Sequence, residues 1–155
     1  MVLRIVQQKL EQCCFEFVAK WFPQALKEKG LECAEALEIT GWAQMIPDLC
    51  QTLNAEIVYT PVGMTLEDAF LFTRQLRDSA VHRHRTETTV IQDMAHSATT
   101  LAFVLGDVPQ AAHLKTLEEH VQSNIDLIQQ HKTLLKARLD QELQEVARES
   151  SHQQW

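Results

Sequence analysis

The chain has 155 residues, of which 45% are hydrophobic and 23% are charged, so it is long enough and apolar enough to bury one hydrophobic core. Its formal net charge of −7 argues against general affinity for nucleic acid, because phosphate contacts need positive charge. With only four Gly and four Pro, the chain has few points at which to turn. This composition favours a few long helices over many short strands, and we expect an all-α fold.

The first predicted helix runs from Val2 to Trp21, with apolar residues recurring three or four positions apart. Charged residues at Lys9, Glu11 and Glu16 interrupt it, which indicates an amphipathic helix and not a signal peptide. No stretch approaches the roughly 20 apolar residues that span a bilayer. We therefore expect an intracellular protein, cytoplasmic or nuclear, that does not insert into a membrane.

The cysteines give no sign of a metal or disulfide framework, because the sequence has no CxxC pair and no secretion signal. We expect reduced thiols packed in a helical core and no metal site. The residues concerned are Cys13, Cys14, Cys33 and Cys50.

The next predicted helices are shorter and more broken. Pro23 ends or kinks the first helix, which resumes briefly and stops at Gly30. A second helical region covers about Cys33 to Leu53, interrupted near Thr40-Gly41, and Pro47 suggests that it bends or starts late.

A connector, Asn54 to Gly63, leads into a third helix that opens at Thr65, where Thr65-Leu66-Glu67-Asp68 is similar to a capping box. This helix is expected to reach the basic stretch at 82–85. Thr86 to Thr89 then provides an N-cap for a fourth helix that ends at Gly106.

The last predicted helix is unusually long, from about Pro109 to Arg148, and the apolar residues from Leu114 to Val146 keep a mostly three-and-four spacing. About 40 residues at 1.5 Å each give a rod of roughly 60 Å, longer than a compact bundle requires. Its distal part should therefore project, pack on a partner or form a coiled coil. The sequence thus predicts one domain over residues 1–148, a four- to five-helix bundle with an overlong C-terminal helix, and a frayed tail at 149–155.

The main local departure from the acidic composition is a basic cluster around Arg77-Asp78-Ser79-Ala80-Val81-His82. An Arg and a His beside an RNA phosphate can cleave the RNA without a metal. Imidazole transfers protons at neutral pH, and guanidinium stabilises the negative charge on the phosphoryl oxygens. Arg77 and His82 are about 140° apart on a continuous helix, so convergence needs a helix break or the reach of the Arg. Asp78 shares the face of His82 and is placed to orient its imidazole.

This motif, in a helix that gives way to the next helix of a small bundle, resembles the signature of the HEPN superfamily of helical domains, many of them metal-independent endoribonucleases. The resemblance covers about residues 65–121, including Phe70 to Leu76 before the motif and the Thr89–Gly106 helix after it. It implies that Arg77 and His82 are the catalytic pair and Asp78 the polar residue between them. It further implies a homodimer in which two motifs form one RNA cleft, no cofactor, and a cyclic phosphate product.

The surrounding basic residues fit either RNA binding or plain helix chemistry. Under the RNA-directed hypothesis, the RNA-binding residues are Arg74, Arg83, His84 and Arg85. Alternatively, basic residues late in a helix complement its macrodipole, and Arg74, Asp78 and His82 form a surface ladder at i,i+4 spacing.

A second hypothesis belongs to a different class. The protein is then a non-catalytic interaction or scaffold protein, and Leu114 to Val146 of the long helix pack on a helical partner. Other enzyme signatures are absent, because the sequence has no glycine-rich phosphate loop, no GxSxG and no HExxH.

Overall fold

The computed structural model describes residues 2–52, 60, 63–82 and 88–153, with side chains for all of these except 80–82, 152 and 153. Over these residues all regular structure is helical, which confirms the all-α prediction. Contacts divide the chain into two units, Met1–Glu119 and His120–Trp155. Of the predicted connector, residues 54–59, 61 and 62 lie outside the described residues, as does Leu53 at the predicted end of the second helical region.

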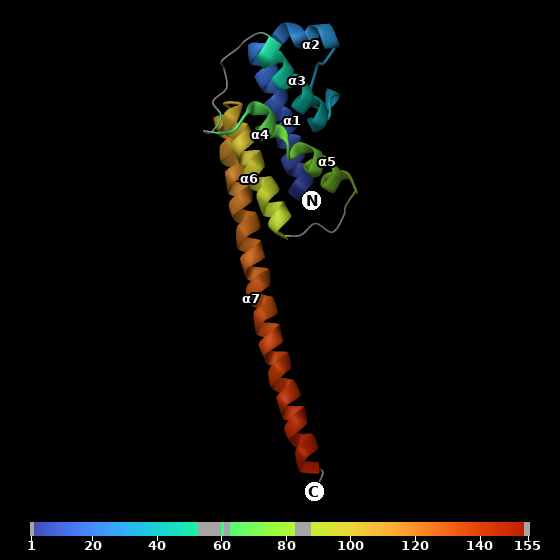
Figure 1. The fold of residues 1–155 in the computed structure, drawn as a ribbon, viewed down its shortest axis with the longest axis vertical. Coiled ribbons are helices and arrows are strands. Elements are labelled where there is room, and N and C mark those ends of the chain that lie inside the picture. Colours follow the sequence, from blue (N-terminus) through green and yellow to red (C-terminus); the bar gives the residue numbers. More distant parts are fainter. Residues whose placement is uncertain (1, 53–59, 61–62, 83–87, 154–155) are drawn as a thin grey trace. The chain divides into compact units, whose positions relative to one another are not determined.

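The first unit is built around its first helix, which contacts helices from most of the following sequence (Figure 1). Helix α1 contacts α2, α3, α5 and α6 as well as the short 3₁₀ helix η1. In chain order the elements are α1 (Val2–Trp21), α2 (Pro23–Lys29), η1 (Ala34–Ala36), α3 (Ile39–Thr52), α4 (Leu66–Phe70), α5 (Thr73–His82), α6 (Thr88–Val104) and α7 (Val108–Gln153).

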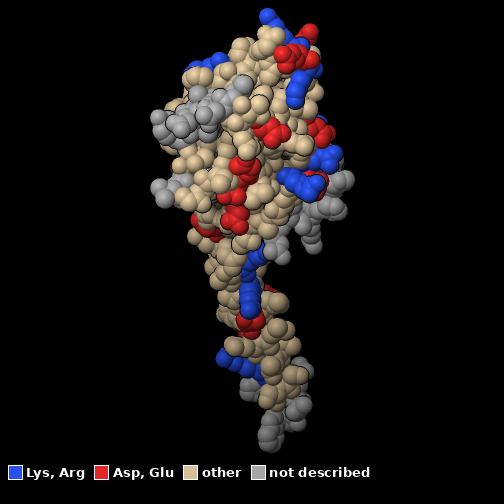
Figure 2. Space-filling view, turned by 45° about the horizontal axis from the view of Figure 1, so that its top comes forward, with Lys and Arg blue, Asp and Glu red and all other residues tan. Residues whose placement is uncertain are grey.

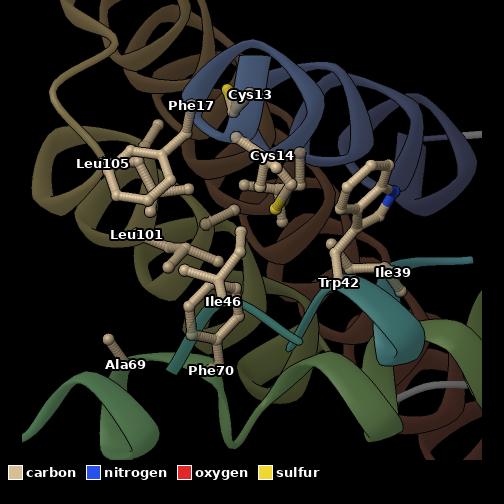
Figure 3. Packing of buried hydrophobic residues seen from close by; sticks show 14 of the residues in the cluster. Cys13, Cys14, Phe17, Ile39, Trp42, Ile46, Ala69, Phe70, Leu101 and Leu105 are labelled. Carbon is tan, nitrogen blue, oxygen red and sulfur yellow. The ribbon is translucent and has the colours of Figure 1, made fainter. Parts of the chain in front are cut away.

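The core of this unit joins side chains from α1, α3, α4 and α6 (Figure 3). Trp42 is fully buried in this core, and its indole Nε1 donates a hydrogen bond to the Ala34 carbonyl at 3.3 Å. The same ring meets Phe15 edge-on, with centroids 6.1 Å apart. Trp21 departs from the predicted apolar face of α1, because it is 44% exposed and lies beneath the Lys20 ammonium at 5.0 Å.

The predicted break in the second helical region lies earlier than expected. It falls at Leu37 and Glu38, between η1 and α3, so Thr40-Gly41 sits inside α3. Pro47 is also accommodated within this helix. The early break leaves Glu38 at the entrance to α3, a helix that contacts α5 and the Arg77 motif it carries.

The third predicted helix is two helices, α4 and α5. The capping box is confirmed: Asp68 N–H donates to Thr65 Oγ1, and the Asp68 carboxylate accepts from Thr65 N–H, both at 3.1 Å. The break between the helices has a packing reason. Phe70 and Leu76 would lie about 120° apart on one straight helix, yet both are buried here.

Helix α7 begins at Val108 and continues to Gln153, past the predicted end at Arg148. Its first turns belong to the first unit, where Ala111 and Leu114 join the core. Glu118 ties these turns to α6, because its carboxylate accepts from Thr99 Oγ1 at 3.1 Å and lies 3.0 Å from His96 Nδ1. Within the described residues, no helix combines the length and apolarity needed to cross a membrane.

Candidate functional site

Arg77, the predicted catalytic arginine, is held between two carboxylates on the surface of the first unit. Its Nε donates to Glu38 Oε2 at 3.1 Å, and its Nη1 lies 3.5 Å from Asp78 Oδ1. The Arg77 side chain is 36% exposed, and those of Glu38 and Asp78 are 61% and 53% exposed. The guanidinium is thus accessible to solvent, but two negative groups already neutralise it.

The partner histidine is placed only through its backbone. Helix α5 is continuous from Arg77 to His82, the last described residue of this segment, which sets the two positions about 140° apart around the helix axis. The side chain of His82 and the whole of Arg83, His84 and Arg85 lie outside the described residues. The described part of the motif is therefore Arg77 with Asp78.

Arg74, one turn before Arg77, lines a shallow hollow between α3 and the α4–α5 segment. The hollow measures about 670 Å³ and also contains the acidic side chains of Asp48 and Glu67. Two acidic groups beside one basic group give this surface little attraction for phosphate. The hollow adds no support to an RNA-binding role for Arg74.

The buried thiols are poorly suited to nucleophilic chemistry. Burial, followed by the nearby charge of Asp107, raises the pKa of Cys13, and burial also raises the pKa values of Cys14 and Cys50. Because the thiolate is the reactive form, these residues serve packing. Among the described residues, no cluster of three or more His, Cys, Asp or Glu side chains is placed to hold a metal.

The second unit presents a different kind of surface. Six apolar side chains of α7 fall within an arc of about 80° around its axis, at 100° per residue. We call them the distal stripe: Ile125, Ile128, Leu135, Leu139, Leu143 and Val146. All but the half-buried Ile125 are more than half exposed, with values between 52% and 63%.

Charged groups interrupt the distal stripe only sparsely. Figure 2 shows much of the visible surface of this unit without Lys, Arg, Asp or Glu. Lys132 lies on the stripe, and Glu142 lies at its edge, where Arg138 Nε approaches Glu142 Oε1 at 3.5 Å. The sequence pattern predicted the apolar spacing of this helix, but the exposure of the stripe required the structure.

No family model, curated protein or solved structure matches this chain. The function of the protein is therefore inferred from its geometry and chemistry.

Proposed function

We propose that this protein is a non-catalytic assembly module whose working surface is the distal stripe, which binds another apolar α-helix. One observation carries the proposal: five large apolar side chains on one face of a single helix are each more than half exposed. Most helical stability in proteins comes from packing an apolar face against other surfaces. The distal stripe is such a face without a packing partner among the described residues.

The size of the stripe suits stable association. Fully burying one large aliphatic side chain contributes roughly 1.5–3 kcal/mol. Association costs about 4–15 kcal/mol in lost translational and rotational freedom, which is comparable with the gain from burying the six partly exposed side chains of the stripe. Five of the six, all but Leu143, follow the a and d spacing of a coiled-coil seam, which supports a helix as the partner.

A photo-crosslinking comparison tests this function. A photoreactive phenylalanine analogue replaces Leu139 on the stripe or Leu134 off it, residues of one type that are 55% and 68% exposed. We expect adducts of defined mass from position 139 in cells, and none from position 134. Equal adducts from both positions, or none from either, would refute helix binding through the stripe.

The RNA-directed hypothesis stays a second prediction. It is supported by the partial exposure of the Arg77 side chain. The carboxylates of Glu38 and Asp78 weigh against it.

An RNA cleavage assay in EDTA tests this second hypothesis directly. Metal-independent cleavage by the unaltered protein, lost in both Arg77→Ala and His82→Ala, is the expected result if the motif is catalytic. Glu38→Gln provides a matched control, because it removes the same ion pair and leaves the arginine in place. Cleavage that survives in both variants would rule out this site.

A further inference from the structure

We propose that the occupant of the distal stripe is a second copy of this chain, paired antiparallel so that Lys132 faces Glu142 of the partner subunit. This inference rests on the proposed function, because it names the partner of the same surface. It is carried by the positions of the two charged residues within the apolar seam.

The seam follows a heptad pattern in which every seventh residue returns to the same position. Ile125, Leu139 and Val146 occupy a positions, and Ile128 and Leu135 occupy d positions. Between residues 125 and 146 the remaining a and d positions hold Lys132 and Glu142. Leu143, the remaining member of the distal stripe, falls at an e position beside the seam, and Glu142, at the edge of the stripe on a straight helix, falls at a d position. A two-helix pairing in this heptad frame therefore places one cation and one anion from each chain at core positions.

Parallel and antiparallel pairing of two copies place these charges against different partners. A parallel, in-register pair sets Lys132 against Lys132 of the partner subunit, and Glu142 against its own copy. Like charges at buried positions are strongly unfavourable. An antiparallel pair places a positions opposite d positions, and one register sets Lys132 opposite the partner's Glu142 twice, by symmetry. Charge complementarity thus selects the antiparallel self-pair.

The same register matches the apolar residues. Leu135 faces the partner's Leu139 beside the two-fold axis, and Ile128 faces the partner's Val146. At the flank, His131 lies on the same side as the partner's Glu145. Lys136 and Arg138 each approach their own copy beside the axis, and salt screens these exposed contacts.

A stagger along the chain also follows from this register. Residue 151 lies opposite residue 123 of the other copy, so two Ser151 positions are separated by about 42 Å along the axis at 1.5 Å per residue. In a parallel pair they lie about 10 Å apart, the usual distance between packed helices.

Charge exchange tests the pairing in the full-length protein, with association followed by analytical ultracentrifugation. Lys132→Glu alone and Glu142→Lys alone are expected to weaken dimerisation by about tenfold or more. The double variant, and an equal mixture of the two single variants, are expected to dimerise as the unaltered protein does. Asp140→Lys, a charge reversal on the outer face of the same helix, is the matched control and is expected to have little effect.

The outcomes separate the orientation from the function. Recovery in the mixture shows that both single variants are folded, so failure of the double variant to recover would overturn the antiparallel register. Spin labels at Ser151→Cys, in a Cys33→Ser background because Cys33 is exposed, should report the long separation, and the short one would overturn the orientation. An unaltered protein that stays monomeric at about 100 μM, well above the micromolar range of ordinary complexes, would overturn self-pairing. Crosslinking confined to position 139 would still uphold helix binding.

Discussion

Arg77 shows how far residue-level reasoning from sequence can reach. Its position on a helix was predicted from the pattern, but its contact with Glu38 joins residues 39 apart in the chain. That contact depends on the break at Leu37 and Glu38, which no Gly or Pro marks. Long-range ion pairs of this kind follow from tertiary placement, which local spacing does not encode.

The burial of Glu11 should make the stability of the folded protein depend on pH. Its side chain is 9% exposed, and burial raises its pKa above the ordinary 4.5, despite the Gln7 amide at 3.4 Å. A raised carboxyl pKa means that the folded state binds the proton more tightly than the unfolded state. The favourable contribution of Glu11 protonation to the stability of the folded state is therefore complete below pH 4.5 and is lost as pH rises through the folded-state pKa.

We accordingly expect Glu11→Gln, which is neutral at every pH, to be more stable than the unaltered protein at pH 7. The gap in the free energy of unfolding should shrink as pH falls toward 4, and urea titrations at several pH values measure it. The exposed Glu28→Gln is the control and should show no such trend. A gap that widens on acidification would show that Glu11 is stabilised in its charged form.

At the scale of elements, local sequence signals predicted where helices begin better than where they are interrupted. Four adjacent residues give the sequence signal for the capping box at Thr65, and the structure contains that capping box. The separation of α4 from α5 has no such local signal, because it arises from the need to bury both Phe70 and Leu76. Thr73 supports the new start, with its Oγ1 donating to the Phe70 carbonyl at 2.6 Å.

Because α4 has only five residues, its N-cap should contribute much of its local stability. Thr65→Ala is expected to destabilise the first turn by about 1 kcal/mol, the usual cost of losing such a cap. Hydrogen exchange should show faster exchange of the Asp68 amide, while α1 amides keep their protection. Thr65→Ser preserves the hydroxyl and should exchange like the unaltered protein. Unchanged exchange in Thr65→Ala would mean that packing alone holds the turn.

At the scale of the whole molecule, the long C-terminal helix was predictable from its spacing, whereas the division of the chain at Glu119 and His120 was not. Leu114 and Leu135 belong to the same apolar pattern along the last helix, yet Leu114 is buried and Leu135 is 56% exposed. The sequence pattern records that a face is apolar and not which surface covers it. The same limit applies to the Arg77 motif, whose spacing says nothing of the carboxylates beside it.

The two units should therefore respond differently to protein concentration. Helicity of the second unit, if it depends on a partner copy, is linked to association by mass action, so its melting temperature rises with concentration. The first unit has its own core around Trp42 and should melt at a temperature independent of concentration. Far-UV circular dichroism reports the helices of both units, whereas Trp42 fluorescence, in a Trp21→Phe/Trp155→Phe background, reports the first unit alone. A transition present in the first signal and missing from the second therefore belongs to the second unit, and both signals are followed at concentrations about a hundredfold apart. The Leu135→Gln/Leu139→Gln variant should lose the concentration dependence of the first signal and leave the second unchanged. If the melting temperature from circular dichroism does not change with the concentration of the unaltered protein, the distal helix is stable alone. A second copy of the chain would then not be needed for the distal stripe to remain helical.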